Sequence, residues 1–239
     1  WANADAMGVD PAQAQALVLS HGHYDHTRGL PGLLQRLGEL RVIAHPLVFE
    51  PRYHETPDGE MADIGPPMSR EELEELGARF ELSDEPVQVL EGAVTTGEVP
   101  RRSGLAPEAP HLMVERDGQV RPDDFRDDLS VVVETGGAPV LVTGCAHAGL
   151  VDIAERAEEV AGRYPSAIIG GTHLADESEE RIAAVAAGLH QRGVRWLAPM
   201  HCSGERGAEL LEKHFEAEVL RPITGDTIGA YDDGSISIV

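Results

Sequence analysis

The sequence predicts an α/β fold in which two sheets are sandwiched between helices. Short apolar runs typical of buried strands recur along the chain, and after residue 147 they alternate with segments whose apolar residues repeat at helical spacing. With 239 residues, 41% of them hydrophobic, the chain is long enough to bury a sizeable core. No internal repeat or linker divides it, so we expect a single domain over residues 1–239.

Local patterns predict the order of the elements. The expected strands are 16–20, 41–45, several within 79–98, a hairpin about residues 116–118, then 129–133, 139–143, 167–170, 194–198, 217–220, 226–231 and 235–239. The expected helices are 30–38, 69–78, 147–163, one after residue 176, and 205–215. Residues 46–68, which hold five prolines and no clear periodicity, are predicted to form a loop or lid.

Two patterns mark the starts of helices. Ser69 and Glu72 have the spacing of a capping box, in which each side chain accepts a hydrogen bond from the other residue's backbone N–H. Asp176, three residues before Glu179, predicts a second cap, and the helix that follows carries an apolar stripe that reaches Leu189.

The charge of the chain limits its partners. Forty-two acidic and 19 basic residues give a net charge of −23 at pH 7. Nucleic acid needs a basic track, and the pair Arg101-Arg102 is too short to form one, so we expect no nucleic-acid partner. No run of 18 apolar residues is present, which predicts no membrane span. A small-molecule substrate remains, and nothing in the sequence predicts an oligomeric state.

The expected location is the cytoplasm. The first residues carry neither the basic nor the apolar region of a secretory signal. Cys145 and Cys202 each lie within two residues of a candidate ligand histidine, and a reduced pair is favoured over a disulfide. Because the chain does not begin with Met and its first strand comes at residue 16, we also expect its start to be incomplete.

The most informative segment is 17–26, where a short apolar strand leads into His21, His23, Asp25 and His26. All four side chains are common ligands of divalent metal ions. His21 and His23, two apart in extended chain, point to the same side and can share one ion. Asp25 and His26, on the turn that follows, can reach a second ion. Packing four such groups together without a partner is costly, so the segment predicts a metal site.

Three further histidines come shortly after predicted strands: His147, His173 and His201. A centre with two ions needs ligands from several strand ends, and His147 and His201 are predicted to supply them. His173 is left open between a metal ligand, a substrate contact and a structural residue.

These motifs resemble the metallo-β-lactamase-fold superfamily. The match begins with His-x-His-x-Asp-His at 21–26 and continues through 96–101, 141–149, 170–174 and 199–204. Together the segments are similar to a branch described as dihydropterin–ribofuranosyl-aminobenzene phosphate synthase-like proteins of methanopterin biosynthesis. The resemblance implies a four-layer αββα sandwich, here lacking its first strands, over nearly the whole chain.

The chain departs from the superfamily pattern at two positions. Many members have a histidine shortly before one strand and a bridging aspartate at the end of the next, where this chain has Asp127-Asp128 and Cys145. The resemblance therefore carries over neither the third ligand of one ion nor the bridging group. Asp128, Cys145 and His173 stay candidates for contact with metal or substrate.

The predicted function is hydrolysis of a small anionic molecule, either a phosphoester or a cyclic ester. Two divalent ions, zinc by default with Mn or Fe as alternatives, can share a water and lower its pKa from about 15.7 towards 7, which gives a bridging hydroxide at neutral pH. Asp25 is the candidate for moving a proton to the leaving group. Arg101 and Arg102 are candidates for binding the anionic group of the substrate.

Two other functions stay open. The first is a transferase of the branch's own type, which would join a pterin to a ribofuranosyl-aminobenzene phosphate. The second is a metal-binding or sensor protein without turnover. A fold of this kind hosts many chemistries, so the motifs are specific for the fold and weak for the substrate.

Overall fold

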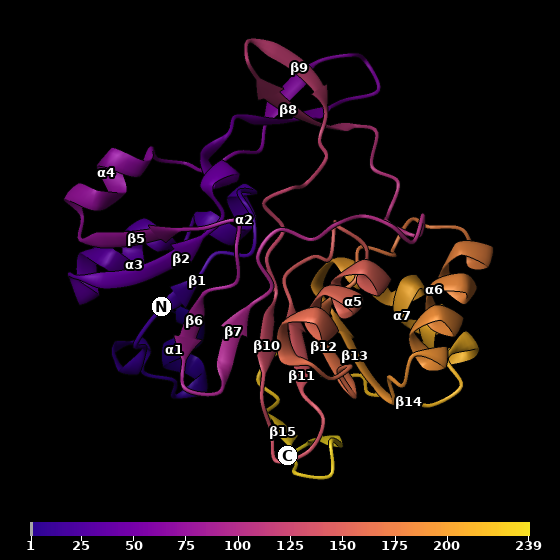
Figure 1. Ribbon diagram of the computed structural model, residues 1–239. Helices are drawn as coiled ribbons and strands as arrows, with labels where there is room; N and C mark the ends of the chain where they lie inside the picture. The colour runs from indigo at the N-terminus through magenta and orange to yellow at the C-terminus, as the bar shows by residue number, and fades with distance from the viewer. Residues whose placement is uncertain (1) are drawn as a thin grey trace. The chain divides into compact units, whose positions relative to one another are not determined.

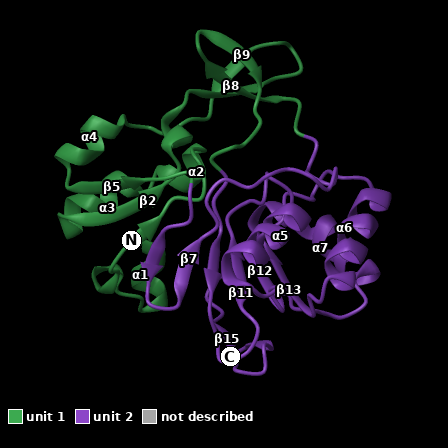
Figure 2. Cartoon of the chain, in the orientation of Figure 1, with its two compact units in different colours: residues 1–84, 109–127 green, residues 85–108, 128–239 purple. Residues whose placement is uncertain are grey.

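The computed structural model describes residues 2–239. Within this range the chain forms two compact units, shown in two colours in Figure 2. Unit 1 runs to Asp84 and adds Ala109–Asp127, and unit 2 comprises Glu85–Glu108 and Asp128–Val239. Each unit is therefore assembled from two stretches of chain, and each has its own sheet and its own hydrophobic core.

Unit 1 contains a small parallel sheet with the strand order β1-β2-β5. Its elements around this sheet are α1 (Ala2–Met7), η1 (Pro11–Gln13), β1 (Leu17–Val18), α2 (Tyr24–Thr27), α3 (Leu30–Leu37), β2 (Leu40–Ala44), α4 (Arg70–Glu75) and β5 (Ala78–Leu82). Leu34 from α3, Val42 from β2 and Leu73 from α4 are buried together in one apolar cluster. The two amphipathic helices thus bury their apolar stripes against the sheet.

The prediction of a loop or lid over residues 46–68 is wrong. This segment forms η2 (Pro46–Phe49), β3 (Arg52–Glu55) and β4 (Met61–Asp63), and β3 pairs with β8 (Leu112–Arg116) to build a four-stranded antiparallel sheet, β4-β3-β8-β9. The partner strand lies about 60 residues away in the chain. Local periodicity carries no signal of such a pairing, because the exposed side chains of β4 do not alternate with buried ones.

The predicted hairpin about residues 116–118 is confirmed. Strand β8 turns directly into β9 (Gln119–Pro122), and the two residues between them have positive φ angles of 55° at Asp117 and 72° at Gly118. A two-residue connection with both φ angles positive matches the twist of the flanking strands, which explains the Asp-Gly sequence.

Unit 2 is built on a seven-stranded sheet with the order β14-β13-β12-β11-β10-β7-β6. Its elements are β6 (Gln88–Leu90), β7 (Ala93–Thr95), β10 (Val131–Val133), β11 (Val140–Thr143), α5 (Leu150–Ala161), β12 (Ala167–Gly171), α6 (Glu179–Gln191), β13 (Trp196–Met200), η3 (His201–Ser203), α7 (Gly204–His214), β14 (Glu218–Val219), β15 (Ile228–Ala230) and β16 (Ile236–Ile238). The strands from β11 to β14 are parallel, and those from β6 to β11 pair antiparallel.

One face of the unit 2 sheet is covered by helices, and part of the other face is covered by a hairpin. Helices α5, α6 and α7 lie along one face, where Leu141 of β11 and Ile153 of α5 belong to one buried cluster (Figure 1). On the other face, Ile236 of the β15–β16 hairpin is buried with Val140 and Ala198. Burial of one whole face and part of the other accounts for the nearly continuous apolar runs that predicted these strands.

The helix caps divide into one confirmed prediction and one wrong one. The capping box of Ser69 and Glu72 is formed at the start of α4, with hydrogen bonds in both directions. Helix α6 begins instead after Ser178, whose hydroxyl accepts a hydrogen bond from the N–H of Arg181. Ser178 satisfies the helix N-terminus two residues later than Asp176 would, which leaves Asp176 outside the helix.

None of the helices in the described range 2–239 is long and apolar enough to cross a membrane.

We expect Leu141→Ala to lower the free energy of unfolding by about 2–5 kcal/mol, because Leu141 is fully buried in the unit 2 core and its truncation leaves a cavity. Urea denaturation followed by circular dichroism measures the change. Val142→Ala is the matched control. Val142 is the next residue along β11 and is 39% exposed, so its truncation should change the free energy of unfolding by about 0.5 kcal/mol or less. Equal losses for the two variants would contradict the assignment of faces.

Candidate functional site

The first group of candidate residues is the histidine loop, residues 21–26, which follows β1 in unit 1. The ring nitrogens His21 Nε2 and His23 Nδ1 lie 3.1 Å apart, and the His21 and His26 ring centroids lie 4.2 Å apart. The Ser20 hydroxyl is 3.1 Å from Nδ1 of both His21 and His26. The structure thus brings the three predicted histidines together, and it buries His21 completely.

This donor set fits a divalent cation. Three imidazoles whose rings lie this close offer several nitrogen donors to one ion. Asp25, 3.5 Å from His26 Nε2 and 39% exposed in its side chain, adds a carboxylate at the edge of the group. Imidazole and carboxylate are the ligands that zinc, manganese and iron share.

A buried arginine holds the backbone of the histidine loop in place. The Gly22 N–H donates a hydrogen bond of 2.8 Å to Oδ2 of Asp127, and Arg52 Nη2 lies 2.8 Å from the same oxygen. Arg52 Nε donates to Asp123 Oδ2 at 3.0 Å. Gly22 has no room for a side chain, because a Cβ there would overlap the Val48 carbonyl and the Arg52 guanidinium. Glycine is therefore required between His21 and His23.

All five N–H groups of Arg52 are used. Besides the two carboxylates, its nitrogens donate to three backbone carbonyls, those of Leu47, Val48 and Glu50. Burial raises the pKa of Asp127 to about 6, and the charge of Arg52 opposes this rise. The positive charge of the guanidinium compensates the two carboxylates that are buried within unit 1.

Sequence reasoning missed this arrangement. The sequence marks Asp127 only as part of the departure from the superfamily pattern, and Arg52 lies in the segment predicted as a loop or lid. The segment also places Phe125 edge-on against the ring of His23, with centroids 5.9 Å apart, and Phe125 has a positive φ of 49°. No local sequence signal identifies the role of Arg52, because its carboxylate partners, Asp123 and Asp127, lie more than 70 residues further along the chain.

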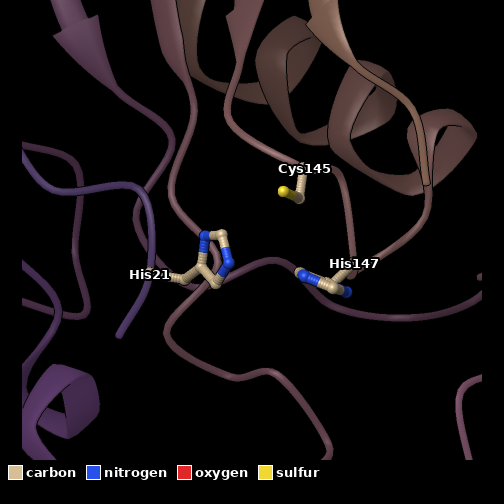
Figure 3. A group of neighbouring side chains, drawn as sticks. All are labelled: His21, Cys145 and His147. Carbon is tan, nitrogen blue, oxygen red and sulfur yellow. The ribbon is translucent and has the colours of Figure 1, made fainter. Parts of the chain in front are cut away.

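A second group of candidate residues lies in unit 2, at the end of the sheet where β11, β12 and β13 finish. Cys145 and His147 both lie in the connection between β11 and α5. Figure 3 shows their side chains and that of His21 from the histidine loop. His147 is buried, and its ring centroid is 4.1 Å from that of His173 in the β12–α6 connection. The structure therefore brings these two predicted residues together within unit 2.

Asp128 is hydrogen-bonded to the backbone of the β11–α5 connection. Its Oδ2 accepts a hydrogen bond of 2.8 Å from the N–H of Ala148, next to His147, and its side chain is fully buried. The superfamily pattern places a histidine near this position. In this chain the aspartate supports the backbone that carries His147, and its candidate role as a ligand stays a prediction.

His201 and Cys202 open the short helix η3 after β13. His201 is exposed, whereas Cys202 is partly buried. The pKa of the Cys202 thiol is lowered to about 5, first by its hydrogen bond with Cys145 and then by His173, against the opposing effect of burial. Neither Cys145 nor Cys202 forms a disulfide, as predicted.

The predicted anion-binding arginines differ in their surroundings. Arg101 donates a hydrogen bond of 3.3 Å to the carbonyl of His147, which brings its positive charge to the β11–α5 connection. The Arg102 guanidinium pairs with Glu159 of α5 at 2.8 Å, and its backbone N–H donates to Asp152. Arg101 is thus the arginine nearer to a candidate ligand, and the binding of substrate by either one stays a prediction.

A sequence model of the metallo-β-lactamase superfamily matches residues 1–157, more than half of the chain. This chain belongs to the metallo-β-lactamase superfamily. The predicted fold class is confirmed with it, since each unit combines a sheet with covering helices and a solved member of the superfamily matches nearly the whole chain.

Three relatives of this superfamily member extend the comparison. The 7,8-dihydropterin-6-methyl-4-(β-D-ribofuranosyl)-aminobenzene-5'-phosphate synthase of Methanocaldococcus jannaschii is 28% identical over 231 residues, 95% of this chain and 79% of that protein. An uncharacterized protein of the same organism is 29% identical over 192 residues, 79% of this chain and 68% of that one. The crystal structure of Tm1679, a metal-dependent hydrolase of the β-lactamase superfamily, matches with a TM-score of 0.75 at 26% identity and covers 92% of this chain and 80% of that one.

We expect Arg52→Met to lower the free energy of unfolding by about 3–5 kcal/mol, because it leaves Asp123 and Asp127 buried without a counter-charge. Urea denaturation measures the loss. Arg41→Met is the matched control: its ion pair with Glu81 is exposed on both sides and should contribute about 1 kcal/mol or less. A loss no larger than that of the control would show that the network does not support unit 1.

Proposed function

We propose that this protein is a metal-dependent hydrolase of a small anionic molecule. The observation that carries the proposal is the histidine loop, where three imidazoles pack with ring nitrogens as close as 3.1 Å. The proposed ligands of two divalent ions are the predicted residues His21, His23, Asp25, His26, His147 and His201. Membership of a metal-dependent superfamily supports the metal, and zinc is the default ion with Mn and Fe as alternatives.

A pair of divalent ions lowers the pKa of water towards neutrality and so supplies a nucleophile for hydrolysis. The chain's own residues have distinct tasks. The Asp25 carboxylate, at the exposed edge of the histidine loop, accepts a proton and returns it to the leaving group. Ser20 orients the rings of His21 and His26 through their Nδ1 atoms, which directs the opposite nitrogens towards a ligand.

An anionic substrate has to be attracted against the charge of the chain. With a net charge of −23, the protein repels anions at long range, so a local cation is required. Arg101 is the better placed of the two predicted arginines, because it donates a hydrogen bond to the carbonyl of His147, a proposed ligand. A phosphoester or a cyclic ester with an acidic group suits this cation. We propose the cytoplasm as the compartment, because both cysteines are reduced.

The second candidate function is the transferase reaction in the name of the M. jannaschii synthase. It is supported by 28% identity over 95% of this chain. Both candidates act on a small anionic molecule, and they differ in the acceptor of the transferred group: water in the hydrolase and an aromatic partner in the transferase. The shared fold does not choose between them, because one fold hosts many chemistries.

We expect protein purified without chelator to contain at least two divalent ions per chain by elemental analysis. His147→Ala should lower this ratio and reduce turnover by about 10-fold or more, because it removes a proposed ligand. His190→Ala is the control: this histidine lies at the end of α6, near Glu216, and should leave both readouts unchanged. Folded protein that holds no metal with all six ligands intact would contradict the proposal.

The two candidate activities are separated by their products. We expect the metal-loaded protein to hydrolyse at least one member of a panel of phosphodiesters and lactones, and Arg101→Ala to raise KM for the anionic members more than it lowers kcat. Release of pyrophosphate from a pterin diphosphate, only when the ribofuranosyl-aminobenzene phosphate is added, would identify the transferase instead.

A further inference from the structure

The carboxylate of Asp152 is buried in unit 2, although it is not one of the proposed metal ligands. Asp152 lies in the first turn of α5 and is only 2% exposed. An aspartate is rarely buried so completely unless its oxygens are paired, because a buried carboxylate without partners is costly. The groups that pair with its oxygens therefore indicate its role.

Both oxygens of Asp152 accept hydrogen bonds from a segment about 50 residues earlier in the chain. Its Oδ1 atom accepts the backbone N–H of Arg102 at 2.8 Å and that of Ser103 at 2.7 Å. Its Oδ2 atom accepts the Ser103 hydroxyl at 2.7 Å. An acidic side chain in the first turn of a helix commonly stabilises the helix's own N-terminus. Asp152 instead binds two consecutive residues of another segment.

This segment, residues 101–106, has further attachments within unit 2. Arg181 of α6 donates hydrogen bonds to the carbonyls of Gly104 and Ala106, at 3.2 and 3.3 Å. At Gly149, just before α5, a Cβ would lie 2.9 Å from the Cα of Ala106, so the segment packs closely on the β11–α5 connection. The backbone of residues 102–106 is therefore fixed to α5, to α6 and to the connection that carries His147.

The residue directly before these attachments is Arg101. Arg101 is exposed, and its Nη2 atom donates a hydrogen bond of 3.3 Å to the carbonyl of His147. An arginine side chain has many rotamers, and a loose backbone would spread its guanidinium over still more positions. The hydrogen bonds of Asp152 begin at the next residue, Arg102, so they restrict the backbone from which the Arg101 side chain extends.

We propose that Asp152 is a positioning residue for Arg101. Its three hydrogen bonds fix the backbone so that the guanidinium stays beside the His147 carbonyl, ready to bind a phosphate or carboxylate group of the substrate. The inference rests on the proposed function, in which Arg101 binds the anionic group. Asp152 acts through Arg101 and does not itself contact the substrate.

The test measures the binding of inorganic phosphate to the metal-loaded protein by isothermal titration calorimetry. We expect Arg101→Ala to weaken binding by about 10-fold, because it removes a charged donor, and Asp152→Ala to weaken it by about 5- to 10-fold. Asp152→Asn should stay within about twofold of the wild type. Its amide oxygen can accept both backbone N–H groups, and its NH2 group can donate to the Ser103 hydroxyl. Glu155→Ala is the matched control, since this carboxylate of α5 pairs with Arg192 and should leave phosphate binding unchanged.

A double-mutant cycle separates positioning from a general structural role. If Asp152 acts through Arg101, adding Asp152→Ala to Arg101→Ala should weaken phosphate binding by less than about twofold more. Two independent losses would instead multiply. With an anionic substrate, Asp152→Ala should raise KM and leave kcat within about twofold, because it weakens binding without touching the reacting atoms.

A milder variant covers the case in which Asp152→Ala does not fold. Ser103→Ala removes one of the three hydrogen bonds and keeps both backbone N–H groups paired, and it should weaken phosphate binding by about 2- to 5-fold. The inference is overturned if the wild type binds no phosphate, if Asp152→Ala (or Ser103→Ala in its place) binds it normally, if Asp152→Asn loses as much as Asp152→Ala, or if the effects multiply. None of the calorimetric measurements needs turnover. The expected pattern in a protein without hydrolytic activity would support the positioning role and contradict only the proposed function.

Discussion

The buried guanidinium of Arg52 is the interaction on which the histidine loop depends. It is fully buried and uses every N–H group, two on Asp123 and Asp127 and three on backbone carbonyls of the chain that precedes it. Asp127 in turn accepts the N–H of Gly22. A buried ion pair of this kind contributes little net stability over an apolar core, so its value lies in fixing geometry. It fixes the backbone between two histidines at one orientation.

In unit 2 the backbone that carries the candidate ligands is positioned by other interactions. Its candidate ligand residues are placed by the register of three parallel strands. The connections that carry them are held by Asp128, which accepts a hydrogen bond from the N–H beside His147, and by glycine at close contacts such as Gly171. Asp128 lies near the position where the superfamily pattern has a histidine.

The acidity of the chain affects these sites unequally. The net charge of −23 is carried mainly by exposed side chains, many of them in surface ion pairs such as Arg41–Glu81 and Arg70–Glu74, which contribute little to stability. Near the candidate ligands, Asp127 forms an ion pair with Arg52, and Asp128 accepts a hydrogen bond from a backbone N–H. An excess of surface carboxylates keeps the protein hydrated, while arginines compensate charge where the chain is buried.

The sequence by itself determined the parallel strands of unit 2, the helices that cover them, the capping box at Ser69 and the grouping of His21, His23 and His26, because each is encoded by residues close together in the chain. Only the tertiary structure decided the strands within 46–68, the role of Arg52 and Asp127, and the meeting of Cys145, His173 and Cys202. These features depend on partners 28 to 75 residues apart in the chain. Local spacing carries no information about such partners, since burial and long-range pairing select them after the sheets have formed.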